Sequence, residues 1–250
     1  MHVDYFKSRN SQCDTKWDSV LLNTSNNVLS ASQEIKIQLF RYLLKHLKKN
    51  YMAIPEVSIG KAVIDMLVIN GEIHAYEIKS KSDSLKRLEE QIETYKKHAN
   101  KVTVVADLKF KDKLLSLEYM EGIGLIFTDD NLKFSIFREA KELDIPKENY
   151  FSYWSPIELK ESLKGLKNYS KYSTMEAYKK ILELLNHNQT RKLTLYRLKQ
   201  KYAEEFDNRK IAIASKDFKR FFEARFNARL KTLEVTPIME IPFKVFADFN

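Results

Sequence analysis

The chain has 250 residues, of which 44% are hydrophobic and 12% aromatic, so it can form a packed core and is not a largely disordered protein. Its single cysteine, Cys13, excludes an internal disulfide and a zinc centre built from several thiolates. No apolar run approaches the roughly 20 residues of a membrane span. We therefore expect a cytoplasmic protein that does not associate with a membrane.

The formal net charge of +9 is concentrated in the C-terminal part of the chain. Residues 151–250 contain 20 Lys or Arg against 12 Asp or Glu, whereas residues 1–150 are close to neutral. Clustered basic residues favour a polyanion such as DNA, because neutralising phosphates releases their counterions. The alternative is a solvated basic surface that promotes solubility.

The predicted elements begin after a polar, aperiodic N-terminal arm at residues 1–30. Ser32 is a suitable N-cap for a first helix, and Asn70-Gly71 is a hairpin signal between two strands. Hydrophobic spacing of period 3.6 indicates the helices and short apolar runs indicate the strands. In chain order we expect a helix at 33–49, strands at 51–59, 62–69 and 73–80, a helix at 84–99, and strands at 102–106, 124–128 and 132–137.

The remaining chain is predicted to be helical. Candidate helices lie at 155–167, 174–186, 194–205 and 216–233. This order of elements predicts an α/β fold in which helices flank a mixed central sheet, followed by an α-helical C-terminal region. We divide the chain into an N-terminal arm at 1–30, a core at 31–145 and a basic helical region at 146–250.

Two carboxylates interrupt apolar strands in this core. Asp65 lies within the run from Val63 to Val68, and Glu77 and Lys79 lie within the next strand. A carboxylate among buried residues is costly unless a cation compensates for it. Mg²⁺ prefers carboxylate and carbonyl oxygens, and it activates water for phosphodiester hydrolysis. The bland alternative is a structural ion pair between Asp65 and Lys79.

The hairpin between these strands restricts the geometry. Because strand residues alternate between faces, a strict two-residue turn at Asn70-Gly71 would place Asp65 and Glu77 on opposite faces of the sheet. They could not then bind one ion. We therefore predict a three-residue connection, or a β-bulge, that brings both carboxylates to one face.

These residues resemble the signature of the PD-(D/E)XK nuclease superfamily. Asp65 matches the first acidic position, and Glu77-Ile78-Lys79 matches the E-x-K triplet. Gln91 and Tyr95 resemble the QxxxY motif of the exonuclease-type branch. The resemblance covers about residues 33–107 and extends to an uncharacterised bacterial and phage subfamily. Ile64 replaces the proline of the signature, at a position that varies widely across the superfamily.

The resemblance implies a restriction-endonuclease-like core that hydrolyses DNA with Mg²⁺ or Mn²⁺. In it Asp65, Glu77 and the main-chain carbonyl of Ile78 would hold the metal. Lys79 would stabilise the developing charge or orient the attacking water. Gln91 and Tyr95, one helical turn apart, would position Lys79 or contact the DNA backbone.

Further residues have two readings each. Glu34 is a candidate ligand of a second ion, or a charge that complements the helix dipole. Glu56 is a weaker candidate for the same ion, or a solvated residue at the edge of a strand. Gln91 and Tyr95 could also belong to an ordinary amphipathic helix. In the C-terminal region, aromatic residues beside basic ones stack bases or form a helix core. The candidate nucleic-acid-binding residues are Arg191, Lys192, Arg197, Lys199, Lys216, Lys219 and Arg220.

The sequence thus predicts a magnesium-dependent deoxyribonuclease that acts in a phage or in bacterial defence. Two other classes stay open. One is a catalytically silent nucleic-acid-binding or regulatory module of the same fold. The other is an interaction protein whose C-terminal helices bind a protein partner or a second copy of the chain.

Overall fold

A computed structural model describes residues 29–47, 50–228, 235–241 and 245 of the protein. One six-stranded sheet forms its centre, with the strands in sequential order from β1 to β6. Pairs β1–β2, β2–β3 and β5–β6 are antiparallel, whereas β3–β4 and β4–β5 are parallel, so the sheet is mixed. The strands are β1 (Met52–Ile59), β2 (Ala62–Ile69), β3 (Ile73–Lys79), β4 (Lys101–Asp107), β5 (Gly124–Thr128) and β6 (Phe134–Arg138).

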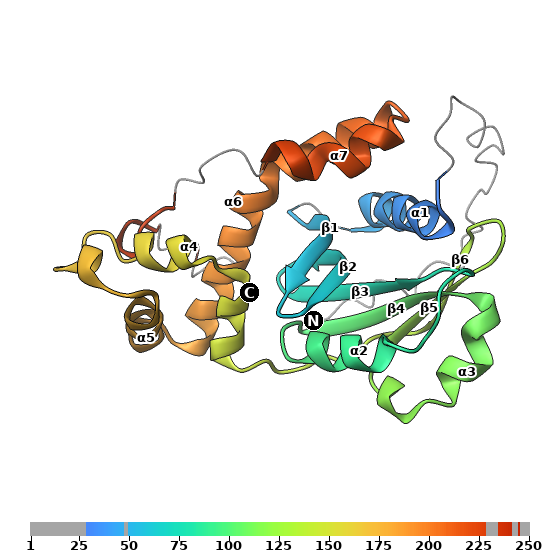
Figure 1. Ribbon diagram of the computed structural model, residues 1–250, viewed down its shortest axis with the longest axis horizontal. Coiled ribbons are helices and arrows are strands. Elements are labelled where there is room, and N and C mark those ends of the chain that lie inside the picture. Colours follow the sequence, from blue (N-terminus) through green and yellow to red (C-terminus); the bar gives the residue numbers. More distant parts are fainter. Residues whose placement is uncertain (1–28, 48–49, 229–234, 242–244, 246–250) are drawn as a thin grey trace.

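Helices cover both faces of this sheet (Figure 1). Helix α1 lies above the sheet in that view and α2 and α3 lie below it, while α4, α5 and α6 stand beside the β1 edge and α7 lies at the top near α1. The helices are α1 (Ala31–His46), α2 (Leu88–Lys96), α3 (Lys111–Leu115), α4 (Pro156–Glu161), α5 (Thr174–Leu184), α6 (His187–Ala214) and α7 (Phe218–Ala228). The predicted α/β class, with a mixed sheet, flanking helices and a helical C-terminal region, is confirmed.

The start of α1 differs from the sequence prediction. The N-cap is Ser30 rather than Ser32. The Gln33 N–H donates to Ser30 Oγ (3.3 Å) and the Ser30 N–H donates to Gln33 Oε1 (2.9 Å). This capping box satisfies two backbone donors at once, and Ser32 could not form one because Ile35 stands three residues after it.

The connection between β2 and β3 is the three-residue loop that the two carboxylates require. The last paired residues are Ile69 and Ile73, and Gly71 in the loop has a φ of 76°. Continuing this register places Asp65 opposite Glu77. The prediction that the two residues share a face of the sheet is confirmed.

Helix α6 extends beyond the predicted helix at both ends. It runs for 28 residues, from His187 to Ala214, rather than over 194–205. Buried polar side chains lie along it, including Thr190, Thr194 and Glu205. Because it is packed on several sides, its apolar residues do not form the single stripe from which helix limits are read.

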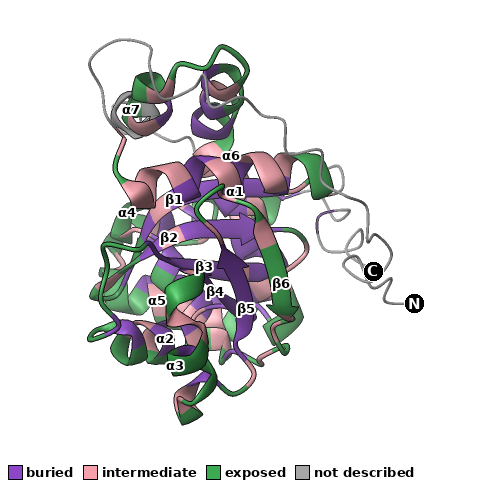
Figure 2. Cartoon of the chain, turned by 90° about the vertical axis from the view of Figure 1, so that its right-hand side faces the viewer, coloured by how far each residue is buried: buried purple, intermediate pink, exposed green. Residues whose placement is uncertain are grey.

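Aromatic residues join α1 to the C-terminal helices. Phe40 of α1 packs edge-on against Phe206 of α6 (5.9 Å between ring centroids) and Phe221 of α7 (5.1 Å). Phe40 and Phe221 are fully buried, within the continuous core that Figure 2 shows in purple. Phe206 and Phe221 therefore belong to the packed core between the helices. Across the described helices, none has both the length and the hydropathy that crossing a membrane requires.

Acid sensitivity is expected at His74 in β3. Its Nε2 atom lies 2.8 Å from Thr103 Oγ1, and burial, reinforced by Lys101, lowers the pKa of His74 from 6.5 to about 3. The unfolded chain takes up a proton near pH 6.5 but the folded chain does not, so His74 lowers stability progressively as pH falls from 6.5 towards 3. We expect the urea midpoint of the wild type to fall more between pH 7 and pH 5 than that of His74→Gln. Equal decreases would show that His74 does not titrate in this way.

Candidate functional site

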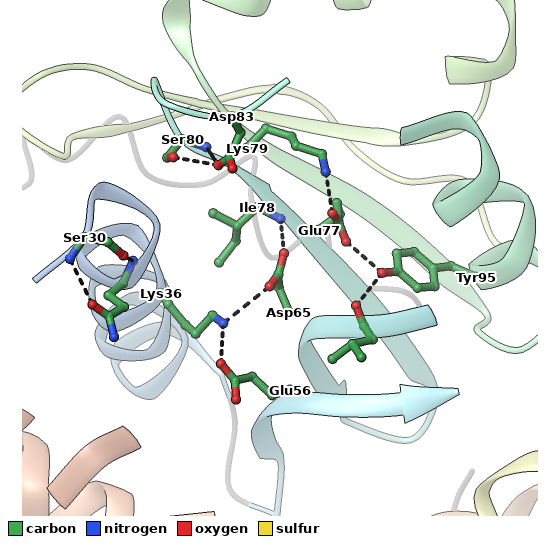
Figure 3. A network of polar contacts seen from close by, with 12 residues as sticks. Ser30, Lys36, Glu56, Asp65, Glu77, Ile78, Lys79, Ser80, Asp83 and Tyr95 are labelled. Carbon is green, nitrogen blue, oxygen red and sulfur yellow. Dashed lines mark hydrogen bonds and ion pairs between the residues drawn. The ribbon is translucent and has the colours of Figure 1, made fainter. Parts of the chain in front are cut away.

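A polar pocket of about 370 Å³ opens between β2, β3 and α2. Its walls include Asp65 from β2, Glu77 and Lys79 from β3, and Gln91 from α2. Four residues selected from separate predicted elements therefore line one cavity. The close-up in Figure 3 shows Asp65 and Glu77 on neighbouring strands at this place.

Asp65 lies where β2 and β3 separate. The paired register ends at Met66 and Tyr76, and beyond it the Ile78 N–H donates to Asp65 Oδ2 (2.9 Å). The other carboxylate oxygen, Oδ1, lies 3.3 Å from Lys36 Nζ of α1. A side chain thus replaces a backbone partner at the end of the ladder, which holds this carboxylate at the mouth of the gap between the strands.

Glu77 is held by two donors from opposite sides. Lys79 Nζ donates to Glu77 Oε1 (2.8 Å), and Tyr95 Oη donates to Glu77 Oε2 (2.7 Å). Lys79 Nζ also donates to Gln91 Oε1 (2.8 Å), and Tyr95 Oη lies 2.7 Å from the carbonyl oxygen of Val63. Gln91 and Tyr95 thus contact Lys79 and Glu77 from one face of α2, as their four-residue spacing predicted.

The electrostatic environment of this pocket favours the binding of a further cation. Burial and the neighbouring Asp65 raise the pKa of Glu77, and Lys79 opposes that rise. Burial and the Glu77 carboxylate also raise the pKa of Tyr95, so its hydroxyl stays a donor. A carboxylate whose ionised form is disfavoured by burial and by a second carboxylate gains from an added positive charge.

Glu34 does not join this site. Ser32 lines the pocket and Lys36 contacts Asp65, and these two residues, four apart, lie on one face of α1. Glu34, midway between them, is turned to the other side of the helix and does not line the pocket. The role of Glu34 as a ligand of a second ion stays a prediction, and its place in the first turn also fits a charge that complements the helix dipole.

The structure adds residues that the sequence did not single out. Lys36 is nearly buried and reaches both Asp65 and Glu56, with its Nζ 3.0 Å from Glu56 Oε1. Lys61 and Arg87 bring two exposed cations to the rim of the pocket. One signal for Lys36 was available, because it interrupts the apolar run of α1 between Ile35 and Ile37.

Most of the basic residues of α6 that were predicted to bind nucleic acid make contacts within the protein. Lys192 and Arg197 are only 6% and 3% exposed, which leaves little of either side chain accessible to a nucleic acid. The Arg197 guanidinium lies over the Trp154 ring (4.6 Å). Arg191 donates to the Gly71 carbonyl (2.6 Å) and Lys199 to the Asn50 carbonyl, which attaches α6 to the sheet.

The three basic residues after α6 are placed differently. Lys216, Lys219 and Arg220 are exposed at the end of α6 and the start of α7. Lys219 lies 3.9 Å from Glu223, and Arg220 Nη2 lies 3.3 Å from Asn208 Oδ1. Their nucleic-acid role stays a prediction.

The region of the chain that matches a known family includes the whole pocket. The sequence model of the family described as bacteriophage P4 protein cII matches residues 25–219 of this chain. The chain belongs to the bacteriophage P4 cII family. Protein cII of Enterobacteria phage P4 is 31% identical to it over 185 residues, which are 70% of this chain and 69% of that protein.

The cII match includes the α1 to α6 segment and therefore every residue of the pocket named above. A solved structure, the SPO1766 protein of unknown function from Silicibacter pomeroyi, is 21% identical and has a TM-score of 0.38. The match covers 47% of this chain and 77% of the SPO1766 chain, and this similarity is too weak to indicate a function.

Tyr95 is expected to contribute to stability through its hydroxyl. Tyr95→Phe removes the single O–H group that donates to the buried carboxylate of Glu77 and that also lies 2.7 Å from the Val63 carbonyl oxygen. We expect the free energy of unfolding in urea to fall by about 1.5–3 kcal/mol, the range for a hydrogen bond to a charged group. Tyr169→Phe, in the C-terminal region, is the control. Equal effects of the two substitutions would contradict a stabilising hydrogen bond from Tyr95 to Glu77.

Proposed function

We propose that this cII-family chain is a magnesium-dependent DNA nuclease that hydrolyses phosphodiester bonds. One observation carries the proposal: the carboxylates of Asp65 and Glu77 and the ammonium of Lys79 line the same pocket. The same three residues match the nuclease signature in the sequence.

The residues of the pocket fit a divalent cation. Both acidic side chains offer the hard oxygen ligands that Mg²⁺ and Mn²⁺ accept, and the main chain of Ile78 lines the same cavity. Burial and Asp65 raise the pKa of Glu77, and a divalent cation bound beside it would favour its ionised form. Asp65, Glu77 and the Ile78 carbonyl would hold the ion.

The chain's own groups then have distinct tasks. When bound, Mg²⁺ supplies Lewis acidity towards the phosphoryl oxygen and the attacking water. Lys79, fixed by Glu77 and Gln91, presents a positive charge where the phosphate accumulates negative charge. Tyr95 holds Glu77 in place through its hydroxyl, and the buried setting keeps both groups preorganised.

Substrate contacts are proposed at the rim. Lys61 lies in the turn between β1 and β2, Arg87 precedes α2, and both are exposed and line the pocket. Two cations around an acidic floor suit a phosphodiester backbone, whose phosphates meet the rim while the scissile bond meets the carboxylates. Lys216, Lys219 and Arg220 would extend this contact if DNA passes the C-terminal helices.

The test is a cleavage assay with purified full-length protein. Linear, nicked and single-stranded DNA are incubated with Mg²⁺, with Mn²⁺ or with EDTA, and the products are separated by size. We expect cleavage of at least one DNA form with either cation and none with EDTA. The absence of cleavage from every form, with protein that is folded and binds cations, would refute the nuclease proposal.

A second candidate is a catalytically silent DNA-binding module. Each carboxylate of the pocket already has a lysine partner, Lys36 for Asp65 and Lys79 for Glu77, as a structural ion cluster would require. This reading predicts no cleavage and DNA binding that weakens steeply with salt. An interaction protein with an apolar interface, in a phage or in bacterial defence, would instead bind its partner with little dependence on salt. The cII relative from a phage supports the phage setting for any of these roles.

A further inference from the structure

Lys36 is a buried cation between Asp65 of the proposed metal centre and the neighbouring Glu56. Its Nζ lies 3.0 Å from Glu56 Oε1 and 3.3 Å from Asp65 Oδ1, and its side chain is 7% exposed. Figure 3 shows the ammonium reaching from α1 to the point between Glu56 and Asp65. A lysine buried to this degree is retained where its charge has partners.

Three acidic residues lie in line across adjacent strands at this level. The β1–β2 register brackets Glu56 and Asp65 between Pro55/Met66 and Val57/Ile64, and the β2–β3 register places Asp65 opposite Glu77. The row is therefore Glu56, Asp65, Glu77, with Lys36 between the first two members. Lys36 thus places one positive charge between Glu56 and Asp65.

The backbone at Glu56 is also unusual. Its φ of 59° lies in the left-handed region, which a non-glycine residue in a strand rarely adopts. Such a conformation persists when the surrounding contacts impose it, and it is common at functional sites. The contact to Lys36 is one that the Glu56 side chain makes from this position.

The charges favour one divalent ion. Three carboxylates and the ammoniums of Lys36 and Lys79 leave a single negative charge when all are ionised. One divalent cation changes this to a single positive charge, whereas two would leave three positive charges in a partly buried pocket. Because like charges repel strongly where water is scarce, the second addition is disfavoured.

From these observations we infer that Lys36 takes the place of a second divalent cation, so that the centre binds one such ion per chain, at Asp65 and Glu77. This inference rests on the proposed function, since it concerns the same centre. It assigns to Glu56 the task of positioning Lys36, rather than that of a metal ligand.

The number of ions bound tests it without any measurement of cleavage. Purified full-length protein is titrated with manganese chloride, and free Mn²⁺ is followed by electron paramagnetic resonance. We expect one ion per wild-type chain. Lys36→Met removes the ammonium at similar side-chain length, so the position between Glu56 and Asp65 becomes open and two ions should bind. The double variant Lys36→Met, Glu56→Gln should return to one.

Two results would overturn the inference: two ions bound by the wild type, or one ion bound by folded Lys36→Met. Lys36→Gln, which keeps polarity without charge, is measured in parallel in case the methionine variant does not fold. The ion count and the cleavage assay give outcomes that can be distinguished. Two ions in a wild type that cleaves DNA refute the inference alone, and one ion in a wild type that does not cleave refutes the nuclease alone.

Discussion

Asp65→Asn is expected to lower the rate of Mg²⁺-dependent DNA cleavage by about 10³-fold or more, as losses of essential charge-stabilising groups do. Asparagine keeps the volume of the side chain and an oxygen that can accept the Ile78 N–H. It removes the negative charge that would hold the cation, and it removes an ion-pair partner of Lys36. The measurement is the single-turnover rate at saturating enzyme, which separates chemistry from product release.

Asp130→Asn is the matched control for that substitution. Its carboxylate is 86% exposed and lies near Lys81, outside the pocket. We expect its cleavage rate to stay within about twofold of the wild type, as for surface changes of small energetic effect. If Asp65→Asn cleaves as fast as this control, the assignment of Asp65 to the centre is wrong.

Glu205→Ala is expected to reduce the free energy of unfolding by about 3–5 kcal/mol, the cost of leaving a buried charge without its partner. Glu205 and Arg209 form an ion pair inside α6, with side chains 4% and 2% exposed. The Arg209 Nε also donates to the Phe221 carbonyl of α7 (3.1 Å). Losing Glu205 therefore weakens both α6 and its junction with α7, as urea denaturation would measure.

The exposed neighbour Glu204 is the control for this change. We expect Glu204→Ala to alter the free energy of unfolding by less than about 0.5 kcal/mol. The double variant Glu205→Leu, Arg209→Met should recover much of the lost stability, because apolar residues of similar volume can replace a buried ion pair. A loss below 1 kcal/mol in Glu205→Ala would show that Arg209 is solvated.

The α/β core was predictable because its signals are local. The strand limits of β2 were read correctly from one apolar run, 62–69, and the three-residue hairpin followed from requiring Asp65 and Glu77 to share a face. Strand alternation makes such an inference strict, because a shift of one residue reverses every side chain.

The residues whose positions the sequence did not reveal depend on tertiary contacts. Lys36 interrupts the apolar run of α1, but only the packing of this helix on the sheet shows that Lys36, and not Glu34, contacts Asp65. Arg197 was assigned to DNA by its charge, yet it is buried against Trp154, a contact between residues 43 positions apart that only the folded chain creates. Charge in a sequence predicts an exposed surface on average, but a long helix packed on several sides breaks that rule.

Anomalous diffraction from crystals soaked in manganese chloride would locate the cation itself. One strong Mn²⁺ peak is expected between the carboxylates of Asp65 and Glu77, at roughly the 2.1 Å oxygen distances of a hard divalent ion. The same soak of Asp65→Asn crystals should lack it. A pocket without a peak in wild-type crystals that bind Mn²⁺ elsewhere would contradict the two-carboxylate metal centre.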